Sequence, residues 1–147
     1  MKRREVLWPL PGVALSAATA AWGSGLPPVE VYKSATCGCC GRWTDHLRQQ
    51  GFIVSTHDVA DVSAERNRLG MPDGVAGCHT AVVGGYVTEG HVPASDIKRL
   101  LTEKPRALGL AVPNMPNASP GMESPHPMPY EVLLMQVDGA VRTFATH

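Results

Sequence analysis

An excess of charge of one sign is missing from this sequence. Its 13 basic residues are balanced by 13 acidic residues, and no run of like charge stands out. Proteins whose main partner is a nucleic acid usually carry a basic excess that neutralises phosphates. The balance therefore argues against a nucleic-acid partner. Aromatic residues are also few, and no internal repeat is found, so the 147 residues are expected to form a single domain.

A long uninterrupted hydrophobic run is missing as well. The mostly apolar stretch from Val6 to Trp22 contains two prolines and is short for a membrane span. It follows three basic residues and includes the small residues of the Ala18-Thr19-Ala20 sequence, a pattern typical of a cleaved secretory signal. We therefore expect residues 1–25 to be an export signal, with membrane contact only before cleavage. The mature protein, residues 26–147, would then be periplasmic.

The cysteines are few but crowded, and all four lie beyond the expected signal, at Cys37, Cys39, Cys40 and Cys78. In an exported protein four cysteines suggest two structural disulfides. A bond between Cys39 and Cys40, or between Cys37 and Cys39, would close a strained small ring. Only one of these three thiols can easily pair with Cys78. The spacing therefore argues against a disulfide scaffold.

Hydrophobic periodicity predicts alternating strands and helices. Strands are expected at residues 29–32 and 52–59, helices at 42–50, 63–70 (capped by Ser63) and 94–101, and a hairpin at 79–92. The resulting order, β-α-β-α-β-β-α, is that of an α/β protein of the thioredoxin-like class. A loop rich in Pro, Gly and Met is expected at 105–129, followed by a C-terminal β-hairpin at 130–146.

This order places three of the thiols between the end of the first strand and the start of the first helix. Ligands gather beyond the strand ends in open α/β sheets. The unpaired N–H groups and partial positive charge of a helix N-terminus favour thiolates. Cys78 precedes the hairpin, which faces the tip of the first helix in a thioredoxin-like fold. All four thiols are therefore expected to converge.

Converging thiolates favour soft metals, chiefly Cu(I), Zn(II) and iron–sulfur clusters. Zinc usually takes ligand pairs that are two to four residues apart. The side chains of adjacent Cys39 and Cys40 diverge, so they suit different ions of one cluster better than a single ion. Cu(I) needs only two or three sulfurs, and a thiolate can bridge several Cu(I) ions. A multinuclear copper–thiolate cluster held by all four cysteines is the favoured interpretation.

The alternative is thiol–disulfide exchange, because Cys37 and Cys40 also form a Cys-x-x-Cys pair. Two features count against it. The residue before Thr80 is His79, where a thioredoxin carries a cis proline, and Cys39 and Cys78 would trap wrong disulfides. Whether the protein is an enzyme is left open, with a copper oxidoreductase as the candidate.

Other residues could assist at the metal. His79 could donate a ligand or a hydrogen bond, and Met115 and Met122 of the Pro-rich loop could bind copper in transit, although methionines in such loops often only fill gaps. His91 could lie near the site, whereas a surface or half-buried position is expected for His46. His57 receives no role, His126 ranks below the two methionines, and His147 is expected to be mobile.

Three segments resemble a known family: YKSATCGCCGRW at residues 32–43, GVAGCHTAVVGGYVTEGHVPASDIKRLL at 74–101, and GLAVPNMPNASPGMES at 109–124. They are similar to the CopG-like family of periplasmic copper-resistance proteins, over nearly the whole mature chain. The resemblance implies a thioredoxin-like fold and a multinuclear copper cluster held by Cys37, Cys39, Cys40 and Cys78. It also implies a role in copper handling, which could include interconversion of Cu(I) and Cu(II), with other periplasmic copper-handling proteins as partners. Asn114 stands where the family more often has Gly, and Asn tolerates the same positive φ.

Overall fold

The structure is a computed structural model that describes residues 25–147, so the expected export signal lies outside the described residues except for its last position. In chain order the elements are β1 (Val29–Lys33), α1 (Gly38–Gln49), β2 (Val54–Asp58), α2 (Val62–Arg68), the 3-10 helix η1 (Asp73–Val75), β3 (His79–Val83), β4 (Tyr86–Gly90), α3 (Ala94–Glu103), β5 (Ala107–Val112), β6 (Glu131–Gln136) and β7 (Val141–Thr146). Within this range no helix combines the length and the apolar character that a membrane crossing requires.

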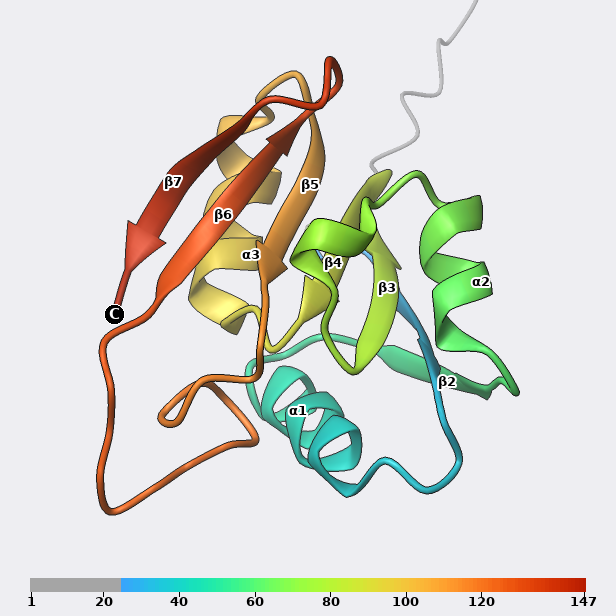
Figure 1. Cartoon of the computed structure of the whole chain (residues 1–147), viewed down its shortest axis with the longest axis vertical. Coiled ribbons are helices and arrows are strands. Elements are labelled where there is room, and N and C mark those ends of the chain that lie inside the picture. The colour runs from blue at the N-terminus through green and yellow to red at the C-terminus, as the bar shows by residue number, and fades with distance from the viewer. Residues whose placement is uncertain (1–24) are drawn as a thin grey trace, which may run out of the picture.

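All seven strands of the described chain form one sheet, in the order β2-β1-β3-β4-β5-β6-β7 (Figure 1). Strand β1 pairs in parallel with β2 and in antiparallel with β3, and β3 and β4 form the expected hairpin around Gly84 and Gly85. The first four strands with α1, α2 and α3 are the thioredoxin-like unit, which confirms the predicted fold class. The C-terminal hairpin turns near Gly139, as predicted, and extends the same sheet.

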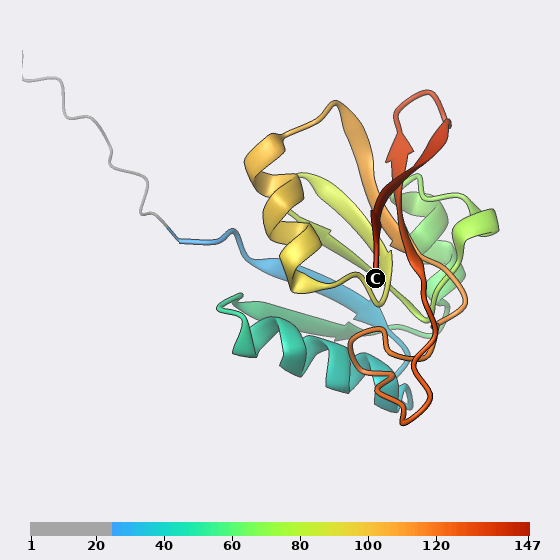
Figure 2. The same ribbon diagram turned by 90° about the vertical axis from the view of Figure 1, so that its left-hand side faces the viewer.

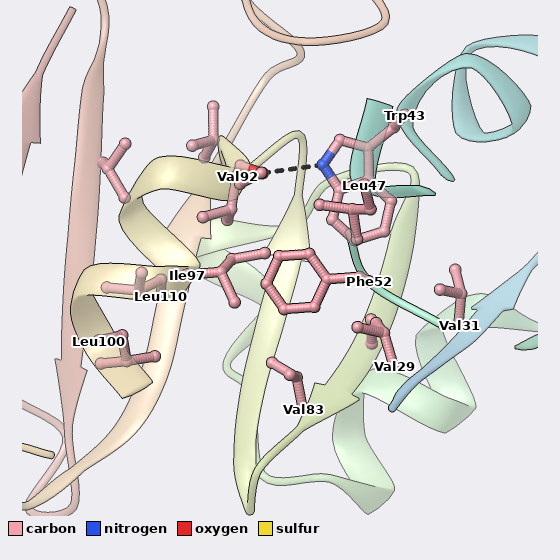
Figure 3. Packing of buried hydrophobic residues seen from close by; sticks show 14 of the residues in the cluster. Val29, Val31, Trp43, Leu47, Phe52, Val83, Val92, Ile97, Leu100 and Leu110 are labelled. Atoms are coloured by element: carbon pink, nitrogen blue, oxygen red, sulfur yellow. Dashed lines mark hydrogen bonds between the residues drawn. The ribbon is translucent and has the colours of Figure 1, made fainter. Parts of the chain in front are cut away.

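The helices cover both faces of the sheet (Figure 2). On one face α1 and α3 pack over the larger core cluster, in which Phe52 lies between Trp43 and Leu47 of α1 and Ile97 of α3 (Figure 3). On the other face, η1 and the segment after α2 cover a smaller cluster that includes Met71, Val75, Val87, Ala111 and Met135. The sheet therefore holds the start of α1 in a fixed place relative to the strand ends.

Strand β5 corrects the sequence prediction. Residues 105–129 were expected to form one loop, but Ala107–Val112 pairs in parallel with β4 and in antiparallel with β6. The last four residues of β5 are buried. A strand buried on both faces lacks the alternation that identifies a half-exposed strand. The irregular segment is therefore shorter and runs from residue 113 to residue 130; we call it the 113–130 loop.

Three further predictions were wrong in detail. Helix α1 begins at Gly38 and not at Arg42, so two of the cysteines are helical. The cap of α2 is Asp61, whose carboxylate accepts the N–H groups of the helix's first turn, and not Ser63. His147 is held in place, because its Nε2 lies 2.7 Å from the Asp96 carboxylate and its backbone pairs with Tyr130.

Candidate metal centre

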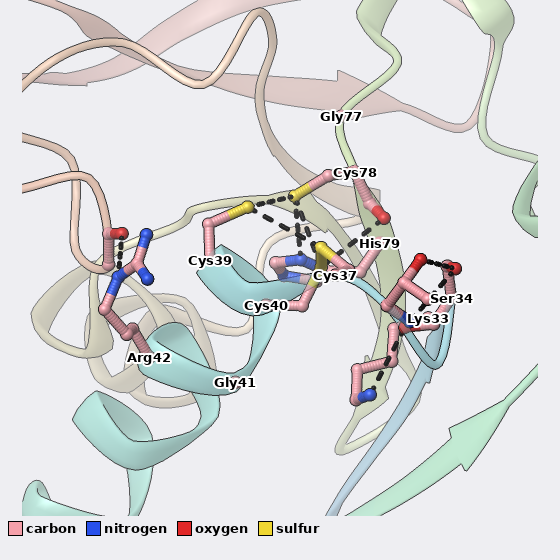
Figure 4. The surroundings of a disulfide bond; sticks show 12 residues. Lys33, Ser34, Cys37, Cys39, Cys40, Gly41, Arg42, Gly77, Cys78 and His79 are labelled. Atoms are coloured by element: carbon pink, nitrogen blue, oxygen red, sulfur yellow. Dashed lines mark hydrogen bonds between the residues drawn. A yellow bond between two sulfur atoms is a disulfide. The ribbon is translucent and has the colours of Figure 1, made fainter.

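The sulfur atoms of Cys37, Cys39, Cys40 and Cys78 meet at the start of α1 (Figure 4). All four lie within 4.8 Å of one another. The Cys78 sulfur is 3.7 Å from that of Cys39 and 3.5 Å from that of Cys40, and the Cys37 and Cys39 sulfurs are 3.6 Å apart. Two sulfurs bound to one ion at about 2.3 Å each lie about 3.8 Å apart in a tetrahedral arrangement. The sulfur spacing is thus close to what a shared soft ion needs.

The backbone at this helix terminus favours negative charge. Cys37 is the N-cap residue of α1, and its side chain makes no capping hydrogen bond. The first turn also contains no acidic residue. The free N–H groups of this turn and the helix dipole therefore act on the thiolates of the Cys-x-Cys-Cys sequence without competition from a capping side chain.

Cys37 and Cys40 form a disulfide in this structure, and Cys39 and Cys78 are free. This is the pairing of the Cys-x-x-Cys alternative. The four cysteines therefore form one disulfide and not the two that a disulfide scaffold would need. A disulfide sulfur carries no thiolate charge, so a metal cluster with four thiolates requires that this bond is first reduced by two electrons.

Cys78 lies on the loop before β3 and not on the helix. Burial raises the pKa of its thiol to about 12, and the nearby Cys39 adds to the rise. The thiolate-stabilising effect expected for the helix terminus therefore does not extend to Cys78. In the metal-free protein Cys78 keeps its proton at neutral pH, and a metal ion must displace that proton when it binds.

The side chains of two histidines contact the Cys78 sulfur. The Nε2 atom of His91 is 3.0 Å from the Cys78 sulfur, and the Nδ1 atom of His79 is 3.3 Å from it. Both rings are fully buried, and burial lowers the pKa of both, that of His79 to about 3. The His79 ring packs at a tilt against Trp43, with 4.2 Å between ring centroids. The sequence analysis named His79 as a possible ligand and His91 only as a residue that could lie near the site.

The 113–130 loop closes over the start of α1. The Arg42 guanidinium donates from Nε to the Gly121 carbonyl at 2.9 Å, and the Pro120 carbonyl lies 2.7 Å from Nδ1 of His91. Gly121 has a φ of +88°, and a Cβ at that position would lie 2.9 Å from the Cys39 carbonyl oxygen. The loop therefore touches the site through backbone atoms, and a side chain at Gly121 would not fit.

A buried carboxylate holds the loop that carries Cys78. Glu89 is fully buried and accepts hydrogen bonds from the Gly77 N–H at 2.7 Å and from the Thr80 hydroxyl. These two residues flank the Cys78–His79 pair. The Arg66 guanidinium balances the charge, with its Nε 3.0 Å from the Glu89 carboxylate. Sequence reasoning missed this pair, although the position of Glu89 within the predicted hairpin strand was a usable signal for the glutamate.

The remaining candidates lie elsewhere or stay predictions. His46 is half-buried and accepts the N–H of Ala94 at 3.1 Å, while His57 is exposed and pairs with Glu30. Met115 is 37% exposed, and Met122 directly follows the Gly121 that touches α1. The role of these two methionines in copper binding stays a prediction. Asn114 has a φ of 65°, a positive value of the kind that Gly adopts freely and Asn tolerates.

A thioredoxin-like domain with a Cys-x-Cys-Cys helix start and a fourth cysteine on the facing loop is the class of protein that this fold and site define. Comparison with known proteins narrows the class. Residues 75–122 match the family described as protein of unknown function, DUF411. Two solved structures of copper resistance protein CopG, forms 1 and 2, are each 41% identical to the chain and superimpose with TM-scores of 0.78 and 0.79.

Each of these comparisons covers 83% of this chain and 98% of the CopG chain. No curated protein sequence matches significantly. The chain belongs to the CopG family of copper resistance proteins, which confirms the resemblance seen in the sequence. It is a CopG homologue with a cysteine cluster able to bind metal.

Proposed function

We propose that the chain binds several Cu(I) ions in one cluster bridged by the sulfurs of Cys37, Cys39, Cys40 and Cys78, and that it acts in copper resistance. The convergence of the four sulfurs within 4.8 Å carries this proposal. The kinship with CopG, whose name refers to copper resistance, supports copper as the metal. Copper is the cargo here, and the four thiolates are its ligands after the Cys37–Cys40 disulfide has been reduced.

The proposal is tested by counting copper. Protein with four free thiols, loaded anaerobically with Cu(I) and freed of excess metal, should retain several copper ions per chain. Cys40→Ser should lower the count, because the Cys40 sulfur lies within 3.5 Å of its neighbour Cys78. His57→Gln, at an exposed site on the edge strand β2, serves as the matched control. A count of one or none in the unchanged protein would contradict a cluster.

Cycling between Cu(I) and Cu(II) is a second part of the proposal. The site lies at the surface end of α1, and Cys37, Cys39 and Cys78 are each partly exposed, so an electron donor or acceptor can approach. Oxidation of one Cu(I) releases one electron to that acceptor, and the reverse step consumes one. Voltammetry of the loaded protein should show a reversible wave. Without such a wave the protein would only store or deliver copper.

Thiol–disulfide exchange is the second candidate function, and the Cys37–Cys40 disulfide favours it. In this reaction a substrate thiolate attacks one sulfur of the disulfide, the other leaves as a thiolate, and a second substrate thiol resolves the mixed disulfide. The metal-free dithiol should then reduce the disulfides of insulin, and Cys37→Ser should abolish that activity. Failure of the unchanged dithiol to reduce insulin would exclude this candidate.

We also propose that residues 1–25 direct export and that the mature protein works in the periplasm beside other copper-handling proteins. The basic start and the apolar stretch of the sequence support this assignment. Fractionation of bacteria that express the full chain, with sequencing of the N-terminus of the recovered protein, tests it. Recovery of an uncleaved chain from the cytoplasm would contradict it.

A further inference from the structure

We infer that Cys78, His79 and His91 form a second, mixed nitrogen–sulfur metal site, which shares the Cys78 sulfur with the proposed cluster. One ligand atom from each residue can be chosen so that all three lie within 4.8 Å of one another. The inference deepens the proposed copper function, since it assigns one copper ion to a different ligand set. Unlike the four-cysteine cluster, this site needs neither Cys37 nor Cys40.

The orientation of the His91 ring shows which of its two nitrogens is free to bind a metal. Its Nδ1 lies 2.7 Å from the Pro120 carbonyl oxygen, and a carbonyl can only accept a hydrogen bond. Nδ1 therefore bears the proton, and in the neutral ring Nε2 holds a free lone pair. Nε2 is the atom that faces the Cys78 sulfur at 3.0 Å. A backbone carbonyl that fixes the far nitrogen in this way is typical of histidines that bind metals.

His79 supplies the second nitrogen. Its side chain is fully buried, and Nδ1 lies 3.3 Å from the Cys78 sulfur. Its other nitrogen, Nε2, makes no hydrogen bond and would carry the ring proton when Nδ1 binds the metal. Trp43 packs at a tilt against this ring, and the centroids of the His79 and His91 rings are 5.4 Å apart.

The distances fit one ion after a small adjustment. A sulfur at about 2.3 Å and a nitrogen at about 2.0 Å from one tetrahedral ion lie about 3.5 Å apart. The two nitrogen–sulfur distances of 3.0 and 3.3 Å must therefore lengthen only slightly. One thiolate with two imidazoles accommodates both oxidation states of copper, whereas a purely thiolate site selects Cu(I). This ligand set therefore provides a place where Cu(II) can remain bound.

The disulfide form of the protein allows the histidine site to be tested without the cluster. With Cys37 and Cys40 joined, the four-thiolate cluster cannot form, but Cys78, His79 and His91 keep their positions. Cys39→Ser then removes the last competing thiol. Co(II) is a suitable probe, because it does not oxidise thiols and its visible spectrum reports sulfur coordination and tetrahedral geometry.

In the Cys39→Ser disulfide protein, we expect one Co(II) per chain with a sulfur-to-cobalt charge-transfer band. His91→Gln should weaken Co(II) binding at least tenfold, and His57→Gln should leave it unchanged. Absence of the charge-transfer band, or His91→Gln binding Co(II) as tightly as its parent, would overturn the inference. These results do not depend on the copper count of the reduced protein, so the inference and the proposed cluster can fail separately.

A second measurement needs no histidine variant, so its result does not depend on whether such a variant folds. Each imidazole bound to Co(II) through one nitrogen keeps a proton on the other, and that proton gives a strongly shifted NMR signal that disappears in D₂O. Two such signals are expected from the loaded Cys39→Ser protein, one for His79 and one for His91. One signal or none would contradict the two-histidine site.

Discussion

At the scale of single residues, Cys78 occupies the central position of the site. Its sulfur lies within 3.7 Å of the sulfurs of Cys39 and Cys40 and of a nitrogen from each of two histidines. The Cys37 sulfur is bonded to that of Cys40 and lies 3.6 Å from that of Cys39, whereas the contacts with histidine nitrogens are made by Cys78. The four cysteines are therefore not equivalent, although nothing in their sequence spacing ranks them.

Replacement of Cys78 should accordingly remove more copper than replacement of Cys37. Cys78→Ser deletes the sulfur that the cluster and the histidine site would share, whereas Cys37→Ser deletes a sulfur that belongs to the cluster alone. The number of Cu(I) ions retained per chain under anaerobic conditions measures the difference. Equal losses from the two variants would show that Cys78 has no bridging role.

Glu89 offers a second test at this scale, because its buried carboxylate is paired with Arg66. Glu89→Gln should lower the free energy of unfolding by about 3–5 kcal/mol, since the guanidinium loses its buried partner. The matched control is Glu103→Gln, which breaks the exposed pair with Arg99 and should cost no more than about 0.5 kcal/mol. Urea unfolding of the metal-free protein measures both, and similar small losses would show that the buried pair does not stabilise the Cys78 loop.

At the scale of elements, the 113–130 loop and α1 act together. The loop fixes His91 through the Pro120 carbonyl and contacts the first turn of α1 through Gly121. Backbone groups make these contacts, so they depend on the path of the chain more than on side-chain identity. A glycine with a positive φ at the contact point is what permits the close approach.

Gly121→Ala tests this contact, with Gly139→Ala as its matched control. Both glycines have nearly the same φ, +88° and +86°, but a Cβ at Gly139 has no atom within 4 Å. Gly139→Ala should cost about 1–2 kcal/mol of unfolding free energy from backbone strain alone. Gly121→Ala should cost about 1–3 kcal/mol more, because the loop must also move off the helix. Equal losses by thermal denaturation would mean that the loop does not pack closely on α1.

Prediction from sequence succeeded where elements have a clear period and failed where they do not. The β3–β4 hairpin, with Gly84 and Gly85 at its turn, and the stripe of α3 were evident from their patterns. Strand β5 was missed because it is buried on both faces and lies next to a proline-rich segment. His91 was not placed, although the predicted hairpin contained the signal. The register in which Thr80 pairs with Glu89 across the Gly84–Gly85 turn, continued by two residues, sets Cys78 opposite His91.

At the scale of the whole molecule, the buried histidines link stability to pH. In the folded metal-free protein, burial lowers the pKa of His79 to about 3 and also lowers the pKa of His91. In the unfolded chain a histidine titrates near its ordinary pKa of about 6.5. Between these values the unfolded state binds more protons, so stability falls as the pH drops from about 6.5.

The free energy of unfolding of the metal-free disulfide protein should therefore fall below about pH 6.5, by up to about 1.4 kcal/mol per pH unit for each buried histidine. His79→Phe keeps a ring against Trp43 but cannot bind a proton, so its stability should depend less steeply on pH. His57→Phe controls for the loss of an exposed histidine. Urea unfolding between about pH 6.5 and about pH 4 measures the slopes, and an unchanged slope in His79→Phe would contradict this explanation.

The convergence of the four sulfurs was predictable from the sequence, but the surroundings of the sulfurs were not. The Cys-x-Cys-Cys spacing and the position of Cys78 before a strand were enough to bring four sulfurs together. The Glu89–Arg66 pair and the closing loop depend on contacts between distant segments, which no local pattern encodes. The disulfide between Cys37 and Cys40 depends on redox state, which the sequence leaves open.

Copper X-ray absorption on the fully reduced, Cu(I)-loaded protein measures most directly whether the sulfurs share several ions. The expected spectrum shows sulfur as the main neighbour of copper, together with a copper–copper scattering path that Cys78→Ser weakens. A spectrum dominated by nitrogen or oxygen, or one without any copper–copper path at full loading, would contradict a thiolate-bridged cluster.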